Sequence, residues 1–291
     1  MILVTGSTGN IGAALLRQLR EQGAGPLRAL TRNAARGAFP EGVEVVEADF
    51  EDLASLEPAF AGVRSMFLLP RLGPDAEILA AARRAGVRHV VLVSSITVET
   101  HPRLGPAIEN AEVERLLQHS GMDWTILRPT QFAANSLMWA ETIRAGEAVR
   151  APYADIGLPT IHPADIAAVA RVALTEPGHV GRIYALTGPE RVTARQQVAT
   201  LAAALDREIP FAEITREQAR AFMVAVFGAA ADAVLDVTGG DITDELVRVR
   251  DTVERVTGTP ARPFRQWVAE NIAAFDALEI GSAGSLVPAS R

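Results

Sequence analysis

Short apolar runs alternate with longer amphipathic runs along the first half of the chain. The short runs are almost wholly apolar, and the longer runs carry apolar residues at three- and four-residue spacing. Such strands between helices are typical of a parallel sheet that helices cover on both faces, and right-handed crossovers make that sheet doubly wound. The predicted strands are 2–5, 27–31, 43–48, 66–69, 89–93 and 124–127, and helices are predicted at 11–20, 76–85 and 107–119.

The pattern changes after about residue 132. One more apolar run, 183–186, predicts a further strand, but most of this half has helical spacing with short links. The helices predicted here are 163–174, 193–205, 216–226, 244–256 and 263–275. A mostly helical second half is typical of a smaller cap that builds a pocket against a sheet. We therefore expect an α/β fold with a helical C-terminal substrate domain.

The composition removes several kinds of chemistry. The chain has 291 residues, a formal net charge of −7 and no cysteine, and all 28 of its Lys+Arg residues are arginine. Without cysteine there is no disulfide, thiolate nucleophile or thiolate-held metal. Without lysine there is no Schiff base and no P-loop lysine. The mild negative charge makes nonspecific nucleic-acid binding a poor expectation.

Three glycines mark the junction between the first strand and the first helix. They follow the spacing G-x-x-G-x-x-G. In this place they allow a tight turn, close approach of a pyrophosphate and close helix–strand packing, and the helix N-terminus attracts negative charge. We therefore predict a Rossmann dinucleotide-binding loop. Its expected cofactor contacts are Gly6, Thr8, Gly9, Asn10, Ile11 and Gly12.

The end of the second strand bears on which dinucleotide binds. An NAD site usually has an acid there for the ribose 2′-hydroxyl, whereas this chain has Arg32, 20 residues after Gly12. A guanidinium forks a 2′-phosphate, so we predict NADP(H) rather than NAD(H). The alternative for Arg32 is a solvated surface side chain. Asp49, after the third strand, is placed to accept from the adenine amino group or to cap the next helix.

Together these residues resemble the short-chain dehydrogenase/reductase superfamily, and within it the atypical, NmrA-like branch. That branch includes NADPH-dependent quinone reductases, isoflavone-reductase-like enzymes and NADP(H)-sensing regulators. The Ser-Gly to Leu-Arg-Pro segment is the signal most specific to the branch. The segments that carry the resemblance are 4–12, 30–32, 48–50, 93–96, 120–129 and 165–167, with Phe132 and Asn135.

The resemblance implies a Rossmann doubly wound parallel sheet with a smaller, mostly helical C-terminal substrate domain. Residues 1–150, with a return at 160–188, are expected to form the NADP(H)-binding domain. Residues 151–159 and 189–280 are expected to form the cap, and 281–291 a flexible tail. The resemblance also implies further cofactor contacts, although core packing is the alternative for each. These residues are Phe50, Leu68, Leu69, Pro70, Ser94, Pro129 and Phe132.

The Tyr-x-x-x-Lys pair that most reductases of the superfamily use is missing. In that pair the lysine lowers the tyrosine pKa and the tyrosine protonates the carbonyl oxygen. The matching positions here are Pro106 and Asn110. Reduction of a quinone, enone or iminium group needs less from an acid, because the charge is delocalised or discharged. We therefore predict Ser95, Asn110 and Tyr153 as catalytic hydrogen-bonding groups for a planar, conjugated substrate.

Other chemistry is less well supported by the sequence. His101 and His162 remain acid–base alternatives, with a helix-capping role as the other reading of His162. The spacing of His, Asp and Glu predicts no metal site. The Met1 start predicts no export signal. The apolar run at 219–235 is interrupted by Asp232 and is too short to span a bilayer, so no membrane span is predicted. A cytoplasmic monomer or homodimer is expected.

Three functions remain compatible with these patterns. The first is NADPH-dependent reduction of a flat, apolar, electron-poor small molecule by hydride transfer. The second is a catalytically silent protein that senses NADP(H). The third is a non-redox enzyme that retains the cofactor. Turnover separates the first from the others, and a preference for one redox state of the cofactor marks a sensor.

Overall fold

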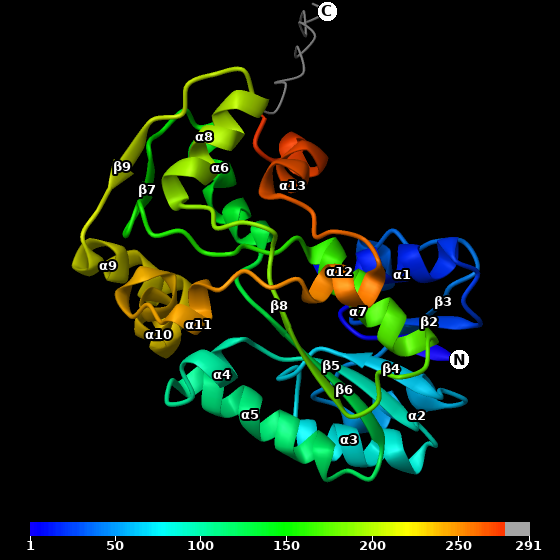
Figure 1. The fold of residues 1–291 in the computed structure, drawn as a ribbon. Helices are drawn as coiled ribbons and strands as arrows, with labels where there is room; N and C mark the ends of the chain where they lie inside the picture. The colour runs from blue at the N-terminus through cyan, green and yellow to red at the C-terminus, as the bar shows by residue number, and fades with distance from the viewer. Residues whose placement is uncertain (277–291) are drawn as a thin grey trace, which may run out of the picture.

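A seven-stranded parallel sheet forms the centre of the computed structural model, which describes residues 1–276 (Figure 1). Its strand order is β3-β2-β1-β4-β5-β6-β8, and all six pairings are parallel. The order reverses between β1 and β4, where ligands bind in doubly wound sheets. The strands are β1 (Ile2–Val4), β2 (Leu27–Thr31), β3 (Glu44–Glu47), β4 (Ser65–Leu68), β5 (His89–Val93), β6 (Asp123–Pro129) and β8 (Arg182–Leu186). These confirm the seven predicted strands.

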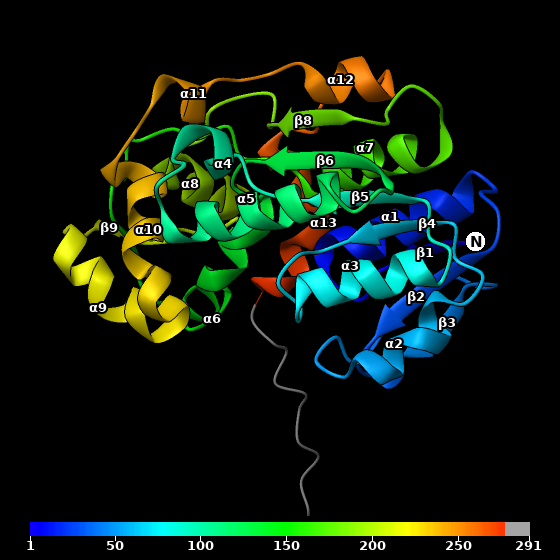
Figure 2. The same cartoon turned by 90° about the horizontal axis from the view of Figure 1, so that it is seen from below.

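Successive residues of a central strand pack in opposite cores, because strand side chains alternate between the two faces of the sheet. Leu3 and Met66 belong to one core, whereas Val4 and Phe67 belong to the other. Helices cover both faces, as Figures 1 and 2 show. The first core is covered by α2 (Leu53–Phe60), α3 (Asp75–Arg84) and α5 (Gly105–Gln118); the second by α1 (Asn10–Glu21), α7 (Pro163–Thr175) and α12 (Thr252–Thr257).

A third core lies in the C-terminal region, where Phe264 stacks on Trp267 and Trp267 meets the edge of Phe275. A short parallel sheet of β7 (Val149–Ala151) and β9 (Phe211–Glu213), which the sequence pattern did not predict, belongs to this region. The other helices are α4 (Thr97–Thr100), η2 (Ala133–Trp139), α6 (Ala140–Arg144), α8 (Ala194–Ala204), α9 (Arg216–Phe227), α10 (Ala231–Leu235), α11 (Asp244–Val247) and α13 (Phe264–Asn271), with short turns at η1 (Ala34–Arg36) and η5 (Ile272–Ala274) and two more, η3 and η4, described below.

The boundary between the two regions lies earlier than the sequence predicted. Ala133, Ile143 and Val149 pack in the third core rather than against the large sheet. The region around 133–151 therefore joins the cap, although it was expected in the first domain. After this region the chain returns to the large sheet, where β8 pairs with β6 and α7 packs on α1. The predicted tail 281–291 and the last predicted cap residues, 277–280, lie outside the described residues.

The helix predicted at 244–256 is two helices, α11 and α12, separated by residues 248–251. Tertiary contacts break it. The Val247 carbonyl accepts a hydrogen bond from Arg191 Nε at 2.6 Å, and the Arg250 N–H donates to Thr187 Oγ1 at 2.9 Å. These backbone groups are thus satisfied outside a helix, which periodicity alone does not reveal.

One described stretch, Arg216–Gly240, is long and apolar enough by length and composition to cross a membrane, and few of its residues are buried. This corrects the expectation that the run is too short. The stretch bends at Gly228, where φ is 55°, and comprises α9, η3 (Gly228–Ala230), α10 and η4 (Asp236–Gly240). Asp232 within it pairs with Arg220 at 2.9 Å.

Candidate active site

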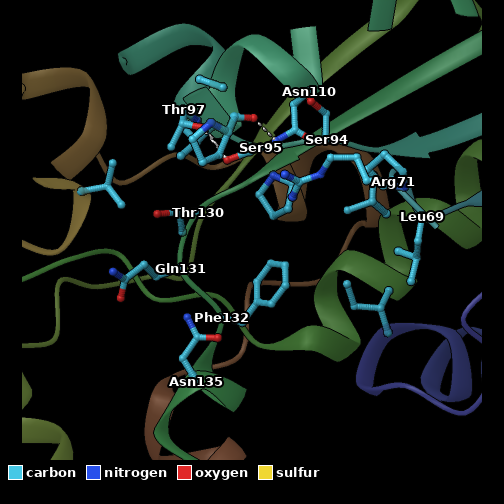
Figure 3. A pocket seen from close by; sticks show the side chains of 18 of the residues that line it. Leu69, Arg71, Ser94, Ser95, Thr97, Asn110, Thr130, Gln131, Phe132 and Asn135 are labelled. Atoms are coloured by element: carbon cyan, nitrogen blue, oxygen red, sulfur yellow. Dashed lines mark hydrogen bonds between the residues drawn. The ribbon is translucent and has the colours of Figure 1, made fainter. Parts of the chain in front are cut away.

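A pocket of about 540 Å³ opens where the carboxyl ends of β1, β4, β5 and β6 meet the C-terminal region. The β1–α1 loop, the residues after the three other strands and one face of α5 line it, together with residues of α10, η4 and α11 (Figure 3). This is the place at which doubly wound sheets bind ligands.

The glycine loop is closely packed at the floor of this pocket. Gly6 has φ 57°, and a Cβ there would lie 2.3 Å from Leu69 Cδ1. A Cβ on Gly12 would lie 2.3 Å from the Gly6 carbonyl oxygen. Ser7 Oγ donates to the Leu30 carbonyl at 2.8 Å, which ties the loop to β2. No larger residue fits at Gly6 or Gly12 without a shift of the atoms around it.

The N-terminus of α1 faces the pocket through Asn10, Ile11 and Gly12. Its N-cap is Gly9, which offers no side-chain cap, and the first turn holds no acid. The first N–H groups of a helix have no partner within it, and the helix dipole is positive at that end. The loop and helix end thus fit a dinucleotide pyrophosphate, which would complete the hydrogen bonds of this turn.

Arg32 and Asp49 lie beyond the pocket lining, at the ends of β2 and β3. Arg32 is exposed, and its guanidinium has no hydrogen bond or ion pair with the rest of residues 1–276. Asp49 Oδ1 accepts from the Glu51 N–H at 3.0 Å. The N-cap of α2 is Asp52, which accepts from the Ala54 N–H, so Asp49 caps the turn before the helix rather than the helix itself.

Of the fifteen predicted cofactor residues, the structure brings ten to the pocket. Thr8, Arg32 and Asp49 lie outside its lining. Phe50 and Leu68 also differ from the expectation, because both side chains are buried in the first core. The alternation of faces along β4 explains Leu68, since its neighbour Leu69 takes the pocket side. The ten are Gly6, Gly9, Asn10, Ile11, Gly12, Leu69, Pro70, Ser94, Pro129 and Phe132.

The two serines after β5 have different hydrogen bonds. Ser94 Oγ donates to Glu114 Oε1 at 2.5 Å, and Arg128 holds that buried carboxylate through Nε at 3.0 Å and Nη2 at 2.6 Å. Ser95 Oγ instead accepts twice from Thr97, from the N–H at 3.2 Å and from Oγ1 at 2.8 Å. The Ser95 hydroxyl proton is therefore left to donate into the pocket, whereas the Ser94 proton is engaged.

Asn110 and Pro106, the positions of the missing pair, both line the pocket on α5. Asn110 Nδ2 donates to the Pro106 carbonyl at 2.8 Å, which leaves its Oδ1 as an acceptor. Thr130, buried with no partner for Oγ1 in the described part of the chain, also lines the pocket, as do Gln131 and Asn135 (Figure 3). The pocket thus offers several neutral hydrogen-bonding groups.

Tyr153, the third predicted catalytic residue, does not line the pocket. Its backbone has φ 54°, and its hydroxyl accepts from Arg216 Nη1 at 3.2 Å. The ring packs against Gly239, where a Cβ would lie 2.3 Å from it. The structure therefore gives Tyr153 a place within the cap, and Ser95 and Asn110 are the predicted catalytic residues that it brings together.

The two histidine alternatives also lie elsewhere. His101 is buried, and its Nε2 hydrogen-bonds to the Asp241 carbonyl at 2.9 Å. His162 caps α7 by accepting the Ala164 N–H on Nδ1 at 3.0 Å, which confirms the capping alternative. Burial lowers the pKa of His162, with Glu270 3.2 Å from Nε2 acting in the opposite direction. Among residues 1–276 no cluster of His, Cys, Asp and Glu could hold a metal ion.

Arg71 is a pocket residue that sequence reasoning did not find. It follows the Leu-Leu-Pro run at the end of β4, and it is the one charged residue among the described residues that line the pocket. Its position after a predicted strand was a signal, since ligands bind at strand carboxyl ends. Asp75 holds its backbone N–H, and its guanidinium contacts Glu109, 38 residues away, which no local pattern predicts.

Comparison with known proteins places this site in a family. Residues 6–177 match the model of a family described as NAD(P)H-binding. A reductase of (4-alkanoyl-5-oxo-2,5-dihydrofuran-3-yl)methyl phosphate from Streptomyces griseus is 42 % identical over 94 % of this chain and 99 % of its own. An NAD(P)H azoreductase from Xenophilus azovorans is 36 % identical over 95 % of this chain and its full length.

The solved structures agree with this result. The NADPH-dependent quinone oxidoreductase of Escherichia coli in complex with NADPH superimposes with a TM-score of 0.75. It is 27 % identical and covers 94 % of this chain and 99 % of its own. The glycine loop, the free helix end and these relatives lead to one conclusion: the chain belongs to the NAD(P)H-binding family and is an NAD(P)H-dependent oxidoreductase of the atypical short-chain dehydrogenase/reductase kind.

Proposed function

We propose that this protein reduces a conjugated, electron-poor double bond of a small molecule, an unsaturated lactone, enone or quinone, with NADPH. The observation that carries the proposal is the pocket lining, in which Ser95 has a free proton but which holds no acidic side chain among the described residues. Such a pocket suits an acceptor that spreads negative charge over several atoms and needs only a weak proton donor.

The activities of the relatives support this substrate class. One relative reduces an alkanoyl-oxo-dihydrofuran phosphate, another is an azoreductase and a third a quinone oxidoreductase. Dihydrofuranones that carry an acyl group, azo compounds and quinones all accept a hydride at a conjugated double bond. The relatives from Streptomyces and Xenophilus cover almost the whole chain, so the likeness extends over both the pocket and the cap.

Each part of the site has a role in this proposal. The α1 N-terminus would hold the pyrophosphate, Arg32 would hold the 2′-phosphate, and Phe132 and Pro129 would flank the nicotinamide. NADPH, when bound, supplies the hydride. Ser95 donates a hydrogen bond to the substrate oxygen, on which negative charge collects when the hydride reaches the β-carbon. Water provides the proton that completes the reduction, and Asn110 accepts from a ribose hydroxyl.

The test is NADPH oxidation with a panel of acceptors. Menadione, 1,2-naphthoquinone, 2-cyclohexenone and a 2-acyl butenolide are each offered with NADPH and, in parallel, with NADH. We expect turnover of at least one conjugated acceptor and a higher kcat/KM with NADPH than with NADH. Tight NADPH binding by calorimetry without turnover of any acceptor would contradict the proposal and favour a sensor or a non-redox enzyme.

The remaining expectations about partners are part of the proposal. We expect a flat, apolar body in the substrate, because Val234, Val237 and Leu246 close the pocket from the cap side. A cytoplasmic monomer or homodimer that binds neither nucleic acid nor a membrane is still predicted. Light scattering measures the oligomeric state, and vesicle flotation measures membrane binding.

A further inference from the structure

Arg71 is the one charged side chain among the described residues that line the pocket. We propose that its guanidinium binds a phosphate group carried by the substrate, so that the substrate class is a phosphorylated conjugated carbonyl compound. This inference rests on the proposed function, because it assigns a binding partner to a second group of the same substrate, apart from the bond that is reduced.

The backbone at Arg71 is fixed in an uncommon conformation. Its φ is 60°, in the left-handed region that residues other than glycine seldom adopt. The Asp75 carboxylate accepts the Arg71 N–H with both oxygens, at 3.1 and 3.2 Å. Backbone strain held by a specific partner is a reason to ask what the side chain does. Here the effect is to direct the side chain of a strand-end residue to the pocket (Figure 3).

The guanidinium itself is only lightly held. Nη1 donates to Glu109 Oε2 at 2.7 Å, and the two side chains are 47 % and 59 % exposed. An exposed ion pair is weak and is readily exchanged for another anion. Nε and Nη2 make no hydrogen bond with another described residue, so a fork of donors remains open. A planar guanidinium fork matches the oxygens of a phosphate.

In the proposed function the cofactor phosphates bind at other places. The glycine loop and the α1 N-terminus suit the pyrophosphate, and Arg32 is free for the 2′-phosphate. In the view of Figure 3, Arg71 lies on the side of the pocket where Ser94 and Asn110 lie. Ser95 lines the same pocket, so one ligand can present its reducible carbonyl to Ser95 and its phosphate to Arg71. The other source of phosphate chemistry, the cofactor, is an outcome of the test.

The test compares two substrates in Arg71→Gln, which keeps a hydrogen-bonding side chain but loses the charge. The probes are a 2-acyl butenolide with a 3-(phosphooxymethyl) group, which is a phosphate ester, and the same compound with a 3-hydroxymethyl group. In the unaltered protein we expect a higher kcat/KM for the phosphate than for the alcohol. In Arg71→Gln this ratio falls at least about tenfold, because charge-assisted hydrogen bonds are lost. Arg71→Lys restores part of it, and the NADPH Kd changes by less than about twofold.

A second variant tests the inference in the opposite direction. Glu109→Gln removes the carboxylate that competes for Arg71. We therefore expect the ratio of kcat/KM for the phosphate probe to kcat/KM for the alcohol probe to rise. Because Glu109→Gln keeps Arg71, it tests the inference even if Arg71→Gln does not fold. Calorimetry with the NADP⁺-loaded protein measures binding of the phosphate compound without turnover.

Three results would overturn the inference. The first is that the unaltered protein shows no preference for the phosphate probe. The second is that Arg71→Gln keeps the preference. The third is that Arg71→Gln weakens NADPH binding and lowers kcat/KM equally for both probes. The third result would assign Arg71 to the cofactor. Turnover of menadione by the unaltered protein, a substrate without an anion, tests the proposed function separately. Arg71-dependent binding without turnover of any acceptor would retain the inference and reject the function.

Discussion

Two adjacent serines show how much a single hydrogen bond decides at the residue scale. Ser94 and Ser95 follow the same strand, and both line the pocket. The Ser94 proton is engaged by Glu114, whereas Ser95 accepts from Thr97 and keeps its own proton. Hydrogen bonds that arrive at a hydroxyl oxygen strengthen the bond that it donates. Ser95 is therefore the better candidate for stabilising charge on a substrate.

We expect Ser95→Ala to lower kcat by about 10- to 100-fold, as removal of a donor to a developing oxyanion does. The NADPH Kd stays within about twofold, because the lost bond belongs to the substrate. Ser94→Ala is the matched control, since it removes a proton that points to Glu114, and its kcat falls less. Equal losses in the two variants, measured with saturating NADPH, would disprove the distinction.

Arg32 gives a prediction about the cofactor. Its guanidinium has no partner among residues 1–276 and sits at the end of β2. We expect Arg32→Ala to raise the NADPH Kd by at least about tenfold through loss of a forked, charge-assisted contact. NADH lacks the 2′-phosphate, and its Kd changes little. Calorimetry with both nucleotides measures this, and a parallel loss for NADH would refute the assignment.

The sequence predicted the residues whose role is local and missed those whose role is tertiary. The glycine loop is a local signature, because its spacing follows from the turn and the helix that it begins. Tyr153 was expected at the pocket because it lies in a linker, yet Arg216 and Gly239 hold it within the cap. Arg71 was missed because its guanidinium contacts Glu109, which lies 38 residues further along the chain.

At the scale of elements, the contact between α1 and the first loop is the most constrained part of the site. A Cβ on Gly12 would lie 2.3 Å from the Gly6 carbonyl oxygen. We expect Gly12→Ala to separate helix and loop and to raise the NADPH Kd at least about tenfold, because the N–H groups no longer converge on the phosphate. Gly25→Ala, where a Cβ meets nothing within 4 Å, is the matched control.

Fluorescence titration with NADPH measures both variants. Gly25→Ala keeps the affinity of the unaltered protein. Tight binding by Gly12→Ala would show that the loop tolerates a side chain there, contrary to the geometry. A lower melting temperature in Gly12→Ala alone would follow from the same clash and would not substitute for the affinity result.

Helices and strands were predictable where a single pattern of apolar positions extends over the whole element. The central strands of the large sheet are buried on both faces, so they are almost continuous apolar runs. The pair β7 and β9 was missed because strands of three residues carry too little pattern. The division of 244–256 was missed because it comes from Arg191 and Thr187, which lie far away in the sequence.

At the scale of the whole molecule, burial of histidines gives stability a pH dependence. Burial lowers the pKa of His162 and of His89. In the unfolded chain the pKa of histidine is about 6.5, so below that pH the unfolded state binds more protons than the folded state. Stability is therefore fully present above about pH 6.5 and declines as pH falls through that value toward the folded pKa.

We expect the melting temperature to fall between about pH 7 and pH 5, and His162→Asn to reduce that fall. Asparagine keeps an acceptor for the Ala164 N–H but does not titrate. At this chain length the melting temperature changes by on the order of 2 °C for each kcal/mol of change in the free energy of unfolding. His119→Asn, at an exposed position, is the control. An unchanged fall in His162→Asn, measured by calorimetry at both pH values, would rule out His162 as a source.

Hydride transfer within this pocket is the central claim, and an isotope label tests it most directly. NADPH carrying deuterium at the transferring C4 position is supplied to the protein with a 2-acyl butenolide, and the product is characterised by mass spectrometry and NMR. We predict one deuterium at the β-carbon of the reduced product. Product without deuterium at carbon, or NADPH that binds and is never oxidised by the acceptor, would contradict the account.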